Sequence, residues 1–96
     1  MKFGLSDITY NKILEVIKKH DKYIFKMFGS RARGDYKANS DIDIVVINCI
    51  EEKEKNRIKD EIDLLDIPYS IDLIFIEEIT KKELLNSIER DGVIIW

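Results

Sequence analysis

The sequence predicts an α/β (α+β) domain in which a small mixed β-sheet is backed by helices. Short apolar segments at 23–28, 41–47 and 69–76 have the length and composition of strands. Charged segments between them carry aliphatic residues at helical spacing. A chain of 96 residues has room for one hydrophobic core, so we expect a single domain over residues 1–96.

The first half of the chain predicts a helix followed by two strands. Ser6 or Asp7 can cap a helix that runs to about His20. The inward face of this helix is aliphatic: Ile13, Leu14 and Ile17. A strand, a helical turn, a polar loop and a second strand follow: 23–28, 30–33, 34–40 and 41–47. The second strand is apolar on both faces, so we expect it to be central in the sheet.

The second half predicts a charged helix, a strand and a last helix. Residues 51–65 form the charged helix, and its buried stripe is Ile58, Ile62 and Leu65. Pro68 blocks its continuation, and 69–76 is the third strand. Thr80 and Glu83 have the spacing of a capping box for a helix that turns three aliphatic residues inward (Leu84, Leu85 and Ile88) and ends at Gly92. The tail Val93–Trp96 is expected to pair as an edge strand or to pack on the core, or alternatively to belong to a partner interface.

Composition limits the compartments and partners of the protein. The net charge of -3 argues against direct binding to a nucleic-acid backbone. No apolar run approaches the ~18 residues of a membrane span, and the first residues lack a signal-peptide pattern. The lone Cys49 suits a reducing compartment, so we expect a cytoplasmic protein. The mixed-charge run 51–59 is expected to be a solvated helix face.

The segment GSRARGDYKANSDIDIVV, residues 29–46, contains the main functional signal. Asp41 and Asp43 stand at the head of an apolar strand and project from the same face, roughly 6–7 Å apart at the backbone. Asp72 is the only carboxylate inside the third strand and completes a cluster if the two strands are neighbours. Each close pair would repel by roughly 2.5 kcal/mol at an effective dielectric near 20. The carboxylates are therefore either protonated or bound to cations, and oxygen-only ligands suit Mg²⁺ or Mn²⁺.

Gly29 and Ser30 predict a phosphate-binding turn beside this acidic cluster. Glycine lets a phosphate approach the backbone, and the serine hydroxyl adds a donor. Arg31 or Arg33 could neutralise phosphate charge, or either could be a plain surface residue. Metal-binding carboxylates and a triphosphate-binding turn indicate two-metal nucleotidyl transfer, with Asp72 as the base nearest the acceptor. The alternative is that the aspartates only end their strands.

The spacing Gly29-Ser30, ten residues, Asp41-x-Asp43, with Asp72 on a later strand, resembles the polymerase-β-type nucleotidyltransferase superfamily and its palm-like fold. The short chain and the fuller motif resemble its minimal nucleotidyltransferase (MNT) branch of antitoxins. This resemblance implies that Asp41, Asp43 and Asp72 hold two Mg²⁺ ions and that Gly29 and Ser30 bind the triphosphate of ATP. It also implies a type VII-like toxin–antitoxin system in which AMP is moved to a tyrosine of a HEPN ribonuclease toxin, releasing pyrophosphate.

Two other functions fit the same sequence. The chain could neutralise a toxin by binding alone, as part of a hetero-oligomer, without any chemistry. It could also keep the transfer chemistry but use a small molecule or an RNA end as acceptor. The net charge of -3 favours a protein acceptor over RNA.

Overall fold

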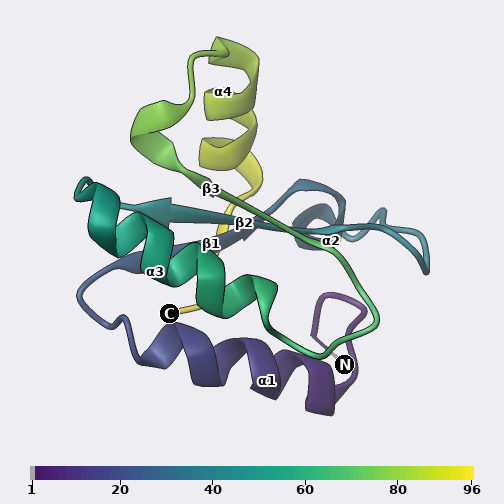
Figure 1. The fold of residues 1–96 in the computed structure, drawn as a ribbon. Coiled ribbons are helices and arrows are strands. Elements are labelled where there is room, and N and C mark those ends of the chain that lie inside the picture. The colour runs from purple at the N-terminus through teal and green to yellow at the C-terminus, as the bar shows by residue number, and fades with distance from the viewer. Residues whose placement is uncertain (1) are drawn as a thin grey trace.

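The computed structural model describes residues 2–96 and contains one four-stranded sheet with helices on both faces (Figure 1). The strands are β1 (Ile24–Phe28), β2 (Ile42–Ile47), β3 (Ile71–Phe75) and β4 (Val93–Ile94). Their order in the sheet is β3-β2-β1-β4. Strand β2 pairs antiparallel with β1 and parallel with β3, and β4 pairs antiparallel with β1. The expected mixed sheet with a central second strand is confirmed.

Helices α1 (Asp7–Lys18) and α3 (Glu52–Asp63) lie together on one face of the sheet, and α4 (Lys82–Asp91) lies on the other (Figure 1). The short α2 (Gly29–Arg33) continues directly from β1, and the 3-10 turn η1 (Ile76–Glu78) follows β3. Ser6 caps α1, because its side chain accepts a hydrogen bond from the Thr9 backbone N–H. Gly92 ends α4 as expected.

Two apolar clusters hold these layers. The larger cluster lies under α1 and α3, and its members from the helices and sheet include Ile13, Ile17, Phe25, Met27, Ile44, Ile58 and Phe75. The smaller cluster joins Ile88 of α4 to Phe28 and Val45 on the opposite sheet face. Because side chains alternate along a strand, the residues beside Phe25 and Met27 point to the α4 face. That face carries the candidate site.

Three local predictions need correction or are resolved. The capping box at Thr80 and Glu83 is wrong, because α4 begins at Lys82 after Lys81 and has no side-chain cap. The solvated face expected at 51–59 is wrong at Lys55, which is 6% exposed and bonds to Glu77 and Glu78 at 2.7 Å each. The tail is an edge strand: the Phe25 N–H donates to the Trp96 carbonyl at 2.9 Å.

Among residues 2–96, no helix has the length and apolar character needed to cross a membrane.

Candidate active site

The candidate site lies where the end of β1 meets the starts of β2 and β3. Asp43 is the register partner of both Phe28 on β1 and Asp72 on β3. Register partners on neighbouring strands point to the same face, so Asp43 and Asp72 lie side by side. Asp41 immediately precedes β2 and, two residues from Asp43, belongs to the same side of the strand. The parallel pairing of β2 with β3 thus brings together all three predicted carboxylates at one end of the sheet.

The charges of Asp72 and Asp41 act on Asp43 in this arrangement. Burial, followed by the negative charges of Asp72 and Asp41, raises the pKa of Asp43 to about 6 from its ordinary 3.8. The charges of Arg33 and Arg31 oppose this increase. Asp41 and Asp72 are exposed, whereas Asp43 is half-buried. Asp43 therefore interacts with both of the other carboxylates, and its ionised form is disfavoured.

Gly29 places the turn after β1 directly against Asp43. Its φ of 74° lies in the left-handed region that favours glycine. A Cβ added at Gly29 would overlap the carboxylate of Asp43. The backbone conformation thus favours glycine, and any larger residue would also have to displace the Asp43 carboxylate, which packs directly against this turn. Ser30 follows in α2 and is half-buried.

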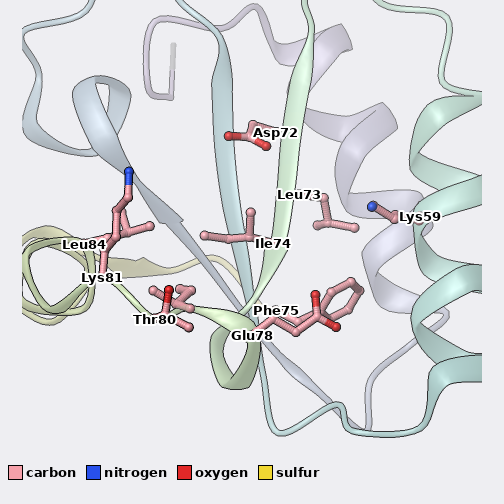
Figure 2. A pocket seen from close by; sticks show the side chains of 10 residues that line it. Lys59, Asp72, Leu73, Ile74, Phe75, Glu78, Thr80, Lys81 and Leu84 are labelled. Carbon is pink, nitrogen blue, oxygen red and sulfur yellow. The ribbon is translucent and has the colours of Figure 1, made fainter.

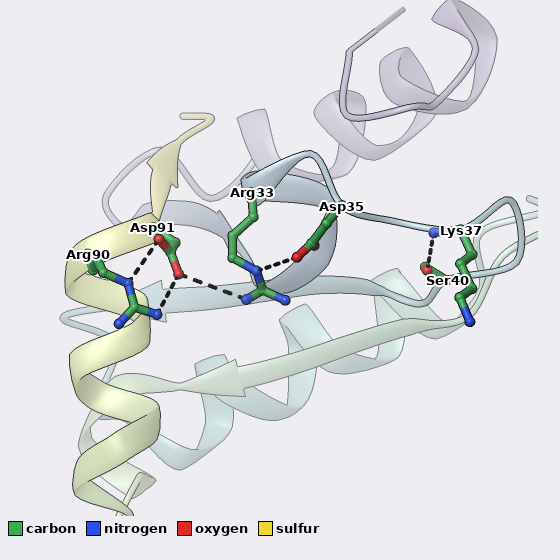
Figure 3. Close-up of polar contacts among 6 residues, drawn as sticks. All are labelled: Arg33, Asp35, Lys37, Ser40, Arg90 and Asp91. Carbon is green, nitrogen blue, oxygen red and sulfur yellow. Dashed lines mark hydrogen bonds and ion pairs between the residues drawn. The ribbon is translucent and has the colours of Figure 1, made fainter.

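The two arginines of the motif have different environments. Arg33 is exposed, and its guanidinium lies between two carboxylates, with Nε 3.2 Å from Asp35 and Nη1 3.9 Å from Asp91 of α4 (Figure 3). The charge of Arg33 also acts on Asp43. Arg31 is only 2% exposed and donates to backbone carbonyls of Phe3, Ala38 and Ser40. The expectation that either arginine is free to meet phosphate thus needs correction for Arg31, because its donors are already occupied.

A cavity of about 450 Å³ opens beside Asp72 at the free edge of β3 (Figure 2). Side chains from both faces of β3 line it, and the remaining lining residues come from α3, from η1 and the segment after it, and from α4. The full lining is Lys59, Asp72, Leu73, Ile74, Phe75, Glu78, Ile79, Thr80, Lys81 and Leu84. Its volume lies in the range of small-ligand sites. Of the predicted site residues, only Asp72 lines it. The cavity therefore adjoins the acidic group on the side away from Gly29.

The donor set fits Mg²⁺ or Mn²⁺ in its chemistry and in its placement on one face. Carboxylate oxygens are the ligands these ions prefer, and the charge interaction at Asp43 would be relieved by a cation. Within the part of the chain that the structure describes, however, no three acidic, histidine or cysteine side chains already stand in ion-holding positions. The carboxylates are neighbours but would need to turn toward a common ion.

Several contacts around the site involve residues that the sequence motif did not single out. Tyr36 and Tyr69 have rings 5.1 and 4.7 Å from the guanidinium carbon of Arg31. Asp91 pairs with both Arg33 and Arg90 across the end of α4. Tyr69 and Asp91 come from distant parts of the chain, so spacing alone gave no signal for them. Only the strand order and helix placement bring them to the motif.

The fold and the acidic end of its sheet are those of a nucleotidyl-transfer domain. Residues 11–96 match the family model described as "Polymerase beta, Nucleotidyltransferase". The chain therefore belongs to the polymerase β nucleotidyltransferase family, as its sequence motif predicted.

One curated relative and several solved structures resemble the chain. A Methanocaldococcus jannaschii protein named "Putative protein adenylyltransferase MJ1379" is 33% identical, over 91% of this chain and 98% of its own length. A chain in a crystal structure of a toxin-antitoxin with AMP-PNP has a TM-score of 0.64 and 24% identity, covering 91% of this chain and 72% of that one. A chain in a structure of a tri-AMPylated Shewanella oneidensis HEPN toxin in complex with MNT antitoxin has a TM-score of 0.61 and 20% identity, covering 96% and 72%. These structures confirm the nucleotidyltransferase fold.

Proposed function

We propose that this protein is an MNT-type antitoxin that moves AMP from ATP to a tyrosine hydroxyl of a cognate HEPN ribonuclease toxin. The observation that carries the proposal is the in-register pair Asp43 and Asp72, with the Asp43 carboxylate against the Gly29 turn. The name of the 33%-identical relative supports protein adenylylation as the reaction. The solved structures of similar fold include toxin-antitoxin complexes, which supports a HEPN protein as partner.

The reaction is a displacement at the α-phosphorus of ATP. The tyrosine oxygen forms a bond to the α-phosphorus, the bond from this phosphorus to the bridging oxygen breaks, and pyrophosphate leaves. Asp72 accepts the proton of the attacking hydroxyl, because it is the member of the acidic group that lines the cavity. Gly29 and Ser30 bind the triphosphate through the backbone and the hydroxyl, and exposed Arg33 adds a positive charge.

Asp41, Asp43 and Asp72 would hold Mg²⁺, with two ions expected and Mn²⁺ as a substitute. When bound, such ions neutralise phosphate charge and make the acceptor hydroxyl easier to deprotonate. The raised pKa of Asp43 is consistent with this role, since a partly buried carboxylate between two others gains most from a bound cation.

The cavity beside Asp72 is the proposed entry for the acceptor tyrosine. On the sheet face that carries Asp72, the cavity has an apolar wall formed by Ile74, Ile79 and Leu84, which suits an aromatic ring. A tyrosine seated there would present its hydroxyl near Asp72, while ATP would lie over Gly29 on the other side of the carboxylates.

The test is transfer of label to the HEPN protein encoded beside this chain. With Mg²⁺ and α-³²P-ATP, the wild type should label that protein, whereas γ-³²P-ATP should leave it unlabelled. Asp43→Asn and Asp72→Asn should each reduce labelling by roughly 100-fold or more, because each removes a charge used in the transition state. Asp60→Asn on the exposed surface of α3 is the matched control and should retain activity. No transfer by the wild type, or equal transfer by the site variants, would contradict the proposal.

A second function, neutralisation by binding alone, is favoured by one observation. Within residues 2–96 the carboxylates do not yet stand in ion-holding positions. A non-catalytic antitoxin would protect cells or RNA only at stoichiometric dose, and Asp43→Asn would protect as well as the wild type. An enzyme should silence the ribonuclease at far lower molar ratios.

A further inference from the structure

Arg31 contacts a chain segment directly before the aspartates of β2. Its Nε and Nη2 atoms donate to the Ser40 carbonyl at 3.1 and 2.9 Å. Its Nη1 atom donates to the Phe3 carbonyl at 2.9 Å. Ser40 is followed immediately by Asp41, and Arg31 itself follows Gly29 and Ser30 in α2. One side chain therefore joins the turn after β1 to the start of β2.

Arg31 also reaches the segment that leads into β3. The guanidinium carbon lies 4.7 Å from the ring centre of Tyr69, which stands three residues before Asp72. In the same region the Ile42 N–H donates to the Ser70 carbonyl at 2.9 Å, so the approaches to β2 and β3 are bonded to each other. Tyr36, from the loop before β2, lies 5.1 Å away. Residues next to all three parts of the site thus surround one guanidinium.

We propose that Arg31 is a positioning residue: it fixes the Gly29–Ser30 turn relative to Asp41, Asp43 and Asp72, and it does not bind phosphate. Arginine suits this task, since its planar, permanently charged fork holds several acceptors in fixed directions. Its consequence for catalysis rests on the proposed function, whereas its consequence for loop geometry does not.

Burial separates this role from that of Arg33. Arg31 is 2% exposed, and its donors face carbonyls on Phe3, Ala38 and Ser40. A phosphate could take these donors only by displacing the main-chain carbonyls that the guanidinium already holds. Arg33 is exposed and needs no such exchange.

The test compares Arg31→Lys, Arg33→Lys and the control Arg57→Lys on the exposed surface of α3. Lysine keeps the charge but cannot reproduce the forked donation. For Arg31→Lys we expect kcat to fall about 100-fold, as for a small misplacement of reacting groups, with KM for ATP nearly unchanged. Amide hydrogen exchange at residues 40–43 should become at least about tenfold faster. Arg33→Lys should instead raise KM for ATP, and Arg57→Lys should match the wild type.

Two results would overturn the inference. One is a higher KM for ATP in Arg31→Lys with exchange at residues 40–43 unchanged, which would make Arg31 a phosphate ligand. The other is a folded Arg31→Lys variant with wild-type kcat and exchange. Hydrogen exchange needs no transferase activity, so it decides the inference even if the wild type transfers no AMP.

If Arg31→Lys does not fold, Tyr36→Leu provides a second test, because it removes one contact of the guanidinium from an exposed loop position. This variant should also show faster exchange at residues 40–43. Wild-type exchange in Tyr36→Leu would overturn the inference as well.

Discussion

Asp43 and Asp72 are register partners across the parallel strands β2 and β3, on the sheet face that α4 partly covers. Two carboxylates in this relationship repel each other unless one is protonated or a cation lies between them. Burial and then the charges of Asp72 and Asp41 raise the pKa of Asp43 to about 6, so part of this increase comes from that repulsion. The fold therefore holds the Asp43 and Asp72 carboxylates next to each other, an arrangement that does not favour stability.

Asp43→Asn should stabilise the protein at pH 7. A carboxyl whose folded pKa exceeds its unfolded pKa contributes stability below the unfolded value and loses it as pH rises through the folded value. For Asp43 this window runs from about 3.8 to about 6. After allowance for solvent screening, the gain at pH 7 should be about 1–2 kcal/mol. Urea unfolding of both proteins at pH 7 and pH 4 checks this; a gain equal at both pH values would contradict it.

Mg²⁺ or Mn²⁺ should stabilise the wild type at pH 7. A ligand that binds only the folded state at ten times its Kd adds about 1.4 kcal/mol. Asp43→Asn and Asp72→Asn should lose most of this increase, and Asp60→Asn, with its exposed side chain on α3, should keep it. Thermal unfolding with increasing metal, and with EDTA, measures the effect. A Tm that rises equally in all four proteins would indicate binding elsewhere.

Gly29→Ala should cost more stability than Gly34→Ala. Both glycines have positive φ, 74° and 94°, so both substitutions carry backbone strain of about 1–2 kcal/mol. Only at Gly29 would the added Cβ also overlap the Asp43 carboxylate, while at Gly34 nothing lies within 4 Å. The difference in unfolding free energy between the two variants isolates that overlap, and Gly29→Ala should also lose transferase activity. Equal losses would place the Asp43 carboxylate away from Gly29.

Ile88→Ala should loosen α4 from the sheet. Ile88 is 2% exposed and packs with Phe28 and Val45, so truncation should cost about 2–4 kcal/mol of unfolding free energy. Ile94→Ala, at a position 63% exposed, is the control and should cost far less. Urea denaturation of the two variants measures the contrast. A small loss at Ile88 would mean that α4 contributes little to holding the site face.

Lys55→Met should destabilise the protein most clearly near neutral pH. Lys55 lies over Phe75 and bonds to Glu77 and Glu78, and methionine keeps the apolar stem while removing the charge. Burial raises the pKa of Glu77, but its bonds to Lys55 and to its own backbone outweigh this and lower the pKa below the ordinary 4.5. The contribution of Glu77 is thus present above pH 4.5 and lost as pH falls. The wild-type advantage in Tm should shrink on acidification, and a constant advantage would rule out this ion pair as its source.

The sequence was sufficient for the strands and the acidic group because both depend on local patterns. Alternating and doubly apolar segments located β1, β2 and β3, and the pairing of β2 with β3 then placed Asp72 beside Asp43. The environment of Arg31 could not be predicted, since its partner Phe3 is 28 residues away in the chain. Lys55 was expected to be solvated because its partners Glu77 and Glu78 lie more than 20 residues later in the chain, in the η1 turn after β3. Long-range polar contacts leave no periodicity to detect.

Strand β3 alternates between the two apolar clusters, with Leu73 and Phe75 directed to the α1 and α3 side and Ile74 to the α4 side. A slip of β3 by one residue would drive Asp72 into the larger cluster and expel Leu73 and Phe75 into water. The protein thus cannot reach full stability in any alignment that misplaces its acid. The hydrophobic core therefore selects the strand register that places Asp72 beside Asp43, because a chain with the shifted register would be less stable and would unfold more readily.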